Sequence, residues 1–201
     1  MYKVIGTPRS RSLRVYWMLE ELGLDYDMID ANPRSPEAKE YNPTGKVPAL
    51  FFEGQVITDS VAIMQFLADR HEKLTFKAGT IDRAVQDSFT FFACDEIDGS
   101  LWTIGKHSFA LPEAMRVPEV IPTAKIEFAN AMKTLEIRLG DNEFVMGATI
   151  TVPDLLLAHC AGWAEKSGVD MPKGAVGDYF KRLRSRPALR RAMAKSAQDS
   201  K

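Results

Sequence analysis

Residues 42–60 restrict the possible folds of this chain more than any other segment. They read Asn-Pro-Thr-Gly-Lys-Val-Pro-Ala-Leu, followed by Phe-Phe-Glu-Gly-Gln-Val-Ile-Thr-Asp-Ser. The start is rich in turn-forming residues, and Pro48 has no N–H to donate to a sheet. Two short β-prone runs, 49–52 and 55–57, flank the dipeptide Glu53-Gly54, which is typical of a hairpin. We therefore predict a turn, two antiparallel strands and the start of a helix.

Two positions in this segment could hold a ligand that has a peptide backbone. Val47 precedes proline, which favours extended geometry and leaves its N–H and C=O in need of partners. Ser60 precedes an apolar pattern with helical spacing. It is either an ordinary N-cap or part of a carboxylate site at the positive end of that helix. Together the two positions favour a short peptide that carries a free carboxylate.

The segment resembles the glutathione-binding segment of the cytosolic glutathione S-transferase family, in particular its bacterial, serine-type or theta-like members. The family pattern is Asn-Pro-x-Gly-x-Val-Pro-x-Leu, a hairpin and then Glu/Asp-Ser. The resemblance implies a cis Val47–Pro48 bond, pairing of the Val47 backbone with the cysteinyl unit of glutathione, and binding of the γ-glutamyl end by Asp59 and Ser60. Lys46 matches a position with a frequent polar contact to the peptide, or it is a solvated loop lysine.

The first third of the chain has the element order of a thioredoxin-like domain. Lys3–Ile5 is predicted to be a strand, 12–23 a helix with Gly23 as its C-cap, and 24–30 a second strand. Such a β-α-β unit favours parallel strands. A short helix at most is expected at 36–41, followed by the β-β-α of 49–71. The same fold is implied by the family resemblance, which makes the sheet mixed.

The rest of the chain is predicted to be helical, with a domain boundary in 72–80. We expect a thioredoxin-like domain at 1–76 and an all-α domain at 77–201. Helices are expected at 81–107 with a break near Gly99, at 124–140, after Thr151, and at 176–195. Thr151 and Asp154 have the spacing of a capping box, with Pro153 in the first turn. This motif also resembles one in the helical domain of the same transferase family.

The loop from Thr7 to Ser12 is the expected catalytic segment. Ser10 or Ser12 could simply cap the following helix, but three arginines, Arg9, Arg11 and Arg14, stand at a helix start, where cations are disfavoured. In serine-type members of the resembled family a serine here donates a hydrogen bond to the glutathione sulfur. Ser10 matches that serine, and Ser12, Thr7 or a backbone amide is the alternative. The family's other classes use a tyrosine near Gly6 that this chain lacks.

Composition excludes several other classes of function. The formal net charge of −1 gives no reason to expect nucleic-acid or membrane partners. There is no long uncharged apolar run, and the two cysteines, Cys94 and Cys160, form neither a disulfide framework nor a Cys-x-x-Cys motif, so a cytoplasmic protein is expected. The three histidines show no metal spacing, and no metal is expected. A cluster of basic residues at 181–195 could bind nucleic acid, but a solvated helix face explains it more simply.

The family resemblance implies a homodimeric glutathione S-transferase of detoxification, which activates the thiol of glutathione as co-substrate for attack on a small apolar electrophile. It also places the pocket for that second substrate between the Ser10 loop and the far end of the long helix, which we expect near Trp102 and Phe109. Two alternatives stay open. One is a non-catalytic ligand-binding or complex-forming module on the same fold. The other is a glutathione-dependent peroxide or disulfide reductase.

Overall fold

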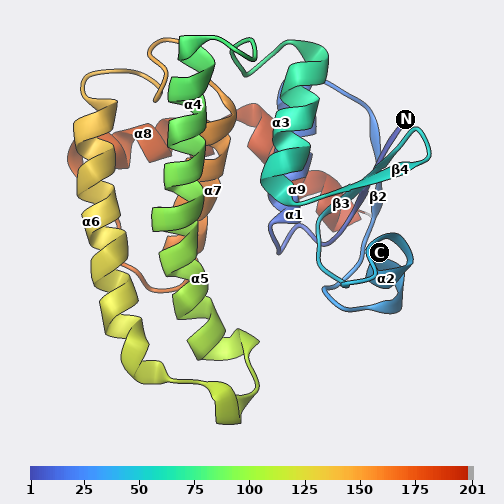
Figure 1. The fold of residues 1–201 in the computed structure, drawn as a ribbon, viewed down its shortest axis with the longest axis horizontal. Helices are drawn as coiled ribbons and strands as arrows, with labels where there is room; N and C mark the ends of the chain where they lie inside the picture. The colour runs from blue at the N-terminus through green and yellow to red at the C-terminus, as the bar shows by residue number, and fades with distance from the viewer. Residues whose placement is uncertain (199–201) are drawn as a thin grey trace. The chain divides into compact units, whose positions relative to one another are not determined.

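The computed structural model describes residues 1–198, and the chain forms two compact units (Figure 1). Among the described residues, 1–78 and 185–198 form unit 1, and 79–184 form unit 2. The chain enters unit 2 close to the expected boundary. The division differs from the expected one because the segment after Arg184 belongs to unit 1 again. Unit 1 is therefore discontinuous in sequence.

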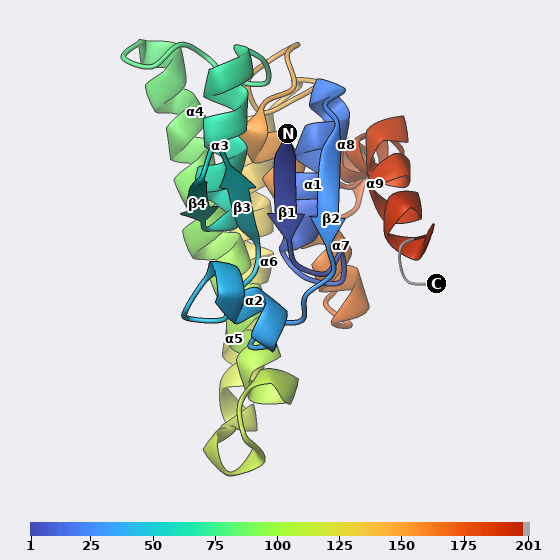
Figure 2. The same ribbon diagram turned by 90° about the vertical axis from the view of Figure 1, so that its right-hand side faces the viewer.

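Unit 1 contains a four-stranded mixed sheet, as predicted for a thioredoxin-like domain. Its strands are β1 (Tyr2–Ile5), β2 (Tyr26–Ile29), β3 (Ala49–Phe52) and β4 (Gln55–Thr58). Their order in the sheet is β2-β1-β3-β4 (Figure 2). Strand β1 is parallel to β2 and antiparallel to β3, and β3 pairs antiparallel with β4. Both residues of the β3–β4 turn, Glu53 and Gly54, have positive φ, which confirms the predicted tight hairpin.

Two helices, α1 (Ser12–Leu22) and α3 (Ser60–His71), cover one face of this sheet. The predicted apolar stripe of α1 is buried, and Gly23 ends the helix in the left-handed conformation with φ 69°. The short helix α2 (Pro36–Tyr41) covers the other face, where Ala38 packs against Ile5 and Ala49. Because side chains alternate along a strand, neighbouring positions of β1 supply both layers.

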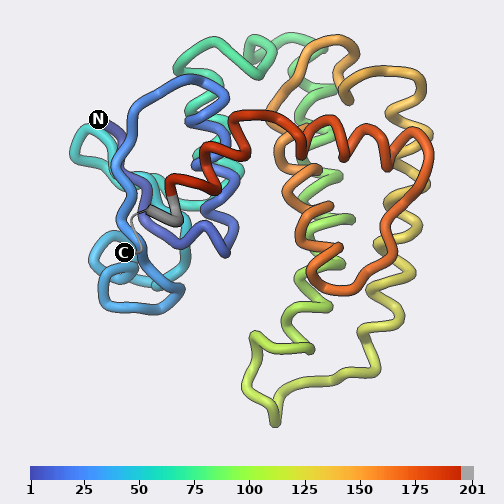
Figure 3. Tube along the Cα trace, turned by 180° about the vertical axis from the view of Figure 1, so that it is seen from behind, coloured from blue at the N-terminus to red at the C-terminus, as the bar shows by residue number. Residues whose placement is uncertain are grey.

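The last helix of unit 1, α9 (Pro187–Gln198), corrects one prediction. We expected a single helix over 176–195, but the chain forms α8 (Gly174–Arg184) in unit 2 and then α9. The tube in Figure 3 shows the interruption between them. Proline cannot donate the hydrogen bond that a continuing helix needs, so Pro187 takes a first-turn position instead. Helix α9 packs against α1 within unit 1.

Unit 2 is helical, as predicted. The first long helical stretch contains α4 (Ile81–Phe92), the π-helical segment η1 (Ala93–Asp98), α5 (Gly99–Gly105) and the π-helical segment η2 (Lys106–Ala110). The irregularity predicted near Gly99 is the π-helical segment η1, which ends directly before this residue; Gly99 itself is helical with φ −58°, so the helical stretch widens there and does not break. Two 3₁₀ turns, η3 (Glu113–Met115) and η4 (Pro118–Val120), then lead to α6 (Ile121–Leu139) and α7 (Val152–Lys166).

A buried carboxylate organises the core of unit 2. Asp154, in the first turn of α7, accepts hydrogen bonds from the backbone and hydroxyl of Thr151, at 2.7 and 2.9 Å, which confirms the pairing expected of a capping box. It also accepts from the amide of Val145 and the hydroxyl of Tyr179, at 3.0 and 2.8 Å. One carboxylate thus joins α7, α8 and the loop between α6 and α7. Among residues 1–198, no helix is long and apolar enough to cross a membrane.

Candidate active site

The loop between β1 and α1 brings two serine hydroxyls together. Ser10 Oγ lies 2.9 Å from Ser12 Oγ, donates to the carbonyl of Thr7 at 2.7 Å and accepts from the Ser12 amide at 3.1 Å. Ser12, the first residue of α1, is fully buried, whereas Ser10 is partly exposed. Since a hydroxyl has one hydrogen, donation by Ser10 to Thr7 assigns Ser12 as the donor between the serines. Of the two, only Ser10 is accessible from outside the loop.

Gly6 lets the serine pair approach the segment around Val47. Its φ of +143° suits glycine, and a Cβ added there would overlap Ser12 Oγ and lie 3.1 Å from Val47 Cβ. The backbone of this corner is also fixed from inside, because the buried Tyr16 hydroxyl donates to the Gly6 carbonyl at 2.6 Å. The two segments that the sequence singled out, 7–12 and 47–48, are therefore neighbours in space.

Val47 has the geometry that the motif implied. The Val47–Pro48 bond is cis, and β3 begins only at Ala49. Neither the N–H nor the C=O of Val47 is hydrogen bonded within the part of the chain that the structure describes. The preceding turn is held by Asn42, whose side chain donates to the Lys46 carbonyl at 2.9 Å and accepts from the Thr44 amide at 3.1 Å. The side chain of Lys46 is exposed.

The start of α3 differs in one detail from the sequence interpretation. Asp59, not Ser60, is the N-cap, since its carboxylate accepts from the amides of Val61 and Ala62 at 2.8 and 3.1 Å. Asp59 adopts φ 72°, an unusual value for a residue other than glycine. Ser60 is the first helical residue, buried at 3% exposure, and its Oγ accepts from Arg14 Nη1 at 3.2 Å.

The burial of Arg14 was not expected from the sequence. Arg14 was noted only as one of three cations at a helix start, whereas its side chain is 2% exposed in the structure. Its position carried a signal, because it lies four residues before the buried Met18, on the core side of α1. A charged side chain at a core position in a helical pattern marks a buried polar contact.

The two aromatic residues proposed for the second substrate lie in unit 2, around Gly105. A Cβ added at Gly105 would lie 3.4 Å from the ring of Trp163 and 3.5 Å from that of Phe109. The ring of Trp102 has its centroid 6.3 Å from that of Trp163. Phe109 is 65% exposed and Trp102 38%. The cluster therefore contains a third ring, Trp163, which no periodicity in the sequence connected with the other two.

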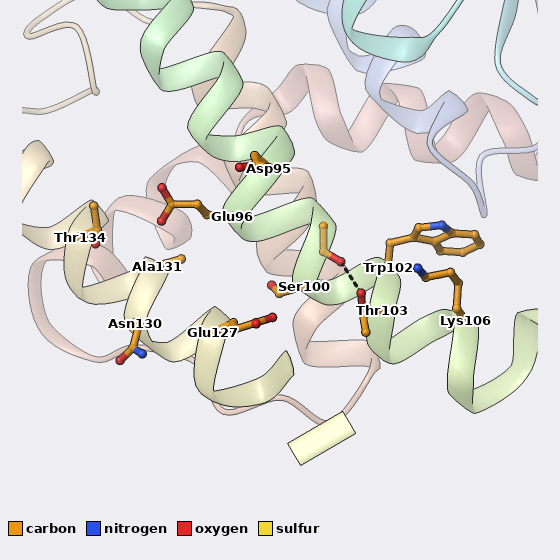
Figure 4. A pocket seen from close by; sticks show the side chains of 11 residues that line it. Asp95, Glu96, Ser100, Trp102, Thr103, Lys106, Glu127, Asn130, Ala131 and Thr134 are labelled. Carbon is orange, nitrogen blue, oxygen red and sulfur yellow. Dashed lines mark hydrogen bonds between the residues drawn. The ribbon is translucent and has the colours of Figure 1, made fainter. Parts of the chain in front are cut away.

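A cavity of about 610 Å³ lies between α6 and the η1–α5 stretch (Figure 4). Its lining includes the carboxylates of Asp95, Glu96 and Glu127. Trp102 also lines it, but in Figure 4 its ring points away from the α6 side chains Glu127 and Asn130. Phe109 is not part of the lining. Because three carboxylates line this cavity and Phe109 does not, it does not correspond to the pocket for an apolar substrate that we expected near Trp102 and Phe109.

No group of three or more potential metal-ligating side chains is found within residues 1–198. Three of the basic residues of 181–195 that seemed able to bind nucleic acid form ion pairs within their own units. In unit 1, Arg186 binds Glu21 through two hydrogen bonds of 2.6 and 2.8 Å, and Arg191 binds Glu20 at 2.8 Å. In unit 2, Arg184 pairs with Glu165 at 2.6 Å.

Comparison with known proteins agrees with this arrangement. Residues 9–70 match the family model described as "Glutathione S-transferase, N-terminal domain". Glutathione S-transferase U8 of Arabidopsis thaliana is 31% identical over 82% of this chain and 73% of its own length. Glutathione S-transferase GstA of Escherichia coli O157:H7 is 24% identical over 96% of this chain and 97% of its own.

A solved structure extends the similarity to the whole fold. A glutathione transferase from Methylococcus capsulatus strain Bath superposes with a TM-score of 0.86, at 27% identity, over 98% of this chain and 100% of its own. The fold, the cis-proline segment with its following helix, and relatives that match over most of their length all point in the same direction. This chain belongs to the glutathione S-transferase family.

Proposed function

We propose that this protein binds glutathione in unit 1 and activates its thiol for attack on small apolar electrophiles. The observation that carries the proposal is the meeting of three elements in one unit: the Ser10–Ser12 pair, the unpaired backbone of Val47 and the start of α3 at Ser60. They offer a hydroxyl for a thiolate, a backbone edge for a peptide and hydrogen-bond donors for a carboxylate.

Each part of glutathione has a partner of suitable chemistry. The N–H and C=O of Val47 can pair with the cysteinyl unit as a strand pairs with its neighbour. The amide and hydroxyl of Ser60 suit the carboxylate of the γ-glutamyl end, while Asp59 offers a carboxylate for its amino group. Asp59 already caps α3, so it would bind with oxygen lone pairs that the cap does not use. Lys46, exposed at the end of the turn, supplies a cation for the glycine carboxylate.

The serine pair is suited to lowering the pKa of a bound thiol. A free thiol titrates near 8.5, and a shift of two units needs roughly 2.7 kcal/mol of preferential thiolate stabilisation. A hydrogen bond to a charged group contributes about 1.5–3 kcal/mol, and a helix start commonly adds up to about 1 kcal/mol. Ser10 would turn its hydrogen from the Thr7 carbonyl to the sulfur. Ser12 would continue to donate to Ser10 Oγ from inside the loop, which strengthens Ser10 as a donor.

No protein nucleophile is needed in this scheme. The thiol proton leaves to solvent when the thiolate forms. The activated sulfur then bonds to the electrophile, either as a leaving group departs with its electron pair or as a conjugated double bond opens and takes up a proton from water. For the second substrate we propose the aromatic cluster of Trp102, Phe109 and Trp163, whose rings are large apolar surfaces. Family membership further supports a cytoplasmic homodimer with a role in detoxification. Sedimentation equilibrium of the purified chain tests the dimer directly.

The test of thiol activation compares Ser10→Ala with Ser12→Ala. The pH dependence of the thiolate ultraviolet absorbance of bound glutathione gives the thiol pKa, and calorimetry gives the affinity. We expect Ser10→Ala to raise that pKa by one to two units, roughly 1.4–2.7 kcal/mol, with little change in affinity. Ser12→Ala should raise it by less, since Ser12 acts through Ser10.

Two outcomes would contradict the proposal. If the unaltered protein shows no binding heat and no thermal stabilisation up to millimolar glutathione, the chain is a binding module for other ligands. If glutathione binds but its thiol pKa is the same in Ser10→Ala, the donor is Thr7 or a backbone amide rather than Ser10. Assays with peroxides and disulfides on the same samples separate transfer from reduction.

A further inference from the structure

Arg14 connects the helix that begins at the serine loop with the helix that begins at Ser60. Its guanidinium donates from Nη1 to Ser60 Oγ at 3.2 Å, and both side chains are almost fully buried, at 2% and 3% exposure. Burial of an arginine costs free energy unless its guanidinium has polar partners, and Ser60 is one of the partners of Arg14. The role of this contact follows from what it leaves for Ser60 to do.

A serine hydroxyl has one hydrogen to donate and two lone pairs that accept. Because Ser60 Oγ accepts from Arg14, its own hydrogen is directed away from the guanidinium, and the nearby cation makes that O–H a stronger donor. Within residues 1–198 no acceptor is found for this hydrogen. The contact therefore orients and polarises the hydroxyl without using its hydrogen.

The cap of α3 leaves a second donor on the same residue. Asp59 satisfies the amides of Val61 and Ala62. The amide of Ser60 itself, at the first helical position, has no partner within the described chain. Ser60 thus presents an N–H and an O–H from one residue, a pair that suits the two oxygens of a single carboxylate.

We infer that Arg14 is a positioning residue for substrate binding, which orients and polarises the Ser60 hydroxyl toward the carboxylate of the γ-glutamyl end of glutathione. The inference rests on the proposed function and adds a residue to it. Arg14 acts at the carboxylate end of the ligand, whereas Ser10 acts at the sulfur. Loss of Arg14 is therefore expected to weaken binding without changing the thiol pKa.

The test pairs variants of the protein with a variant of the ligand. Glutathione is compared with γ-aminobutyryl-cysteinylglycine, which lacks only the carboxylate in question. The unaltered protein should bind glutathione at least about 10-fold more tightly than this analogue, as expected for a charge-assisted hydrogen bond. In Arg14→Gln the ratio should fall to about 3 or less, and in Arg14→Lys it should recover in part, because lysine keeps a charge and a donor.

Kinetics and a double variant separate positioning from structural support. Arg14→Gln should raise KM for glutathione about 10-fold, leave kcat at saturating glutathione within about 3-fold, and leave the thiol pKa unchanged. Once Ser60→Ala is present, adding Arg14→Gln should change KM by less than about 3-fold. Arg190→Gln, an exposed arginine on α9, is the matched control.

The outcomes distinguish the inference from the function on which it rests. If the unaltered protein does not bind glutathione, the proposed function fails. If it binds and discriminates against the analogue, but Arg14→Gln and Arg14→Lys keep the full ratio, the inference is overturned. An equal fall in affinity for both ligands also overturns it, since that result reports a general loss of structure. Should Arg14→Gln not fold, Arg14→Lys with both ligands gives the same decision.

Discussion

Gly6 determines how closely the two halves of the candidate site approach each other. Ser12 Oγ and Val47 Cβ both lie against the position where a side chain would stand. Glycine also adopts its φ of +143° without strain, whereas other residues do not. The Ser12 hydroxyl occupies the space where a side chain at position 6 would stand.

Replacing Gly6 with alanine should therefore damage the site and the fold together. We expect a loss of at least about 1–3 kcal/mol in the free energy of unfolding from backbone strain alone. A rise in the bound thiol pKa should accompany it, because Ser12 must move away from Ser10. Denaturant unfolding and the thiolate titration measure the two effects. Gly54→Ala is the control, since its φ is +77° but no atom lies within 4 Å of its added Cβ.

If Gly6→Ala and Gly54→Ala lost equal stability and kept the same thiol pKa, the crowding at Gly6 would have no functional consequence.

The geometry of the candidate site could be predicted from the sequence where it is local. The segment 42–60 contains its own turn, hairpin and helix start, so Val47, Asp59 and Ser60 could be named in advance. The contact between Arg14 and Ser60 could not, because the two residues are 46 positions apart.

Helices α7 and α8 are joined through the Asp154–Tyr179 hydrogen bond of 2.8 Å. Burial raises the pKa of Asp154, and the hydrogen bonds that it accepts oppose the shift. Burial also raises the pKa of Tyr179 well above its ordinary value, with further contributions from the negative charge and hydrogen bond of Asp154. The neutral phenol is therefore the form that the folded protein favours.

Tyr179→Phe should lower stability at neutral pH by roughly 1.5–3 kcal/mol, the value of a hydrogen bond to a charged group. The sign of the pH effect follows from linkage. Above about pH 10 the unfolded chain releases the tyrosine proton while the folded chain keeps it, so the unaltered protein loses stability as pH rises toward the raised pKa. The variant should lack that component, up to about 1.4 kcal/mol per pH unit.

Denaturant unfolding between pH 7 and 11 measures both effects. Tyr41→Phe, which alters a half-buried tyrosine in unit 1, is the matched control. If the free energy of unfolding falls equally steeply with rising pH in the unaltered protein and in Tyr179→Phe, Tyr179 does not couple folding to pH.

The capping box could be predicted from Thr151-x-x-Asp154, because its partners are three residues apart. Tyr179, whose hydroxyl also binds Asp154, could not be predicted in this way, because it lies 25 residues away in the sequence.

Helices differ in how far residues close in sequence determine where they begin, end and change form. The helix stripe and C-cap of α1 were predicted because apolar spacing and Gly23 act within one element. The division of 174–198 into α8 and α9 was missed, although Pro187 is a local signal, because the run of basic residues suggested one continuous face. Gly99 indicated an irregularity in the first long helical stretch, but η1 contains no Pro, and its π-helical form and its bounds came only from the structure.

At the scale of the whole molecule, two ion pairs join the end of the chain to its first helix. Glu21 is the more buried partner: its side chain is 6% exposed, it binds Arg186 through two hydrogen bonds, and it also accepts from Trp17 Nε1 at 2.9 Å. Glu20 and Arg191 are 15% and 55% exposed. Solvent screens the second pair more than the first.

Double-mutant cycles should therefore rank the two pairs. For Glu21→Gln with Arg186→Gln we expect a coupling free energy of about 1–3 kcal/mol in unfolding. For Glu20→Gln with Arg191→Gln we expect less than about 1 kcal/mol, falling further in high salt. Equal couplings, or a larger one for the exposed pair, would contradict this order.

The domain division expected from the sequence, 1–76 and 77–201, did not predict these contacts, because they join residues 165 and 171 positions apart.

The return of α9 to unit 1 also sets an order of events during protein synthesis. The first 78 residues leave the ribosome well before Pro187, and all of 79–184 is translated in between. At translation rates of about 5–20 residues per second, that interval is roughly 5–20 s. During it, the face of α1 that α9 will cover is without its partner. Unit 1 therefore begins its synthesis first but is completed last, and a nascent chain stalled before α9 should be more open to proteases and chaperones than the released protein.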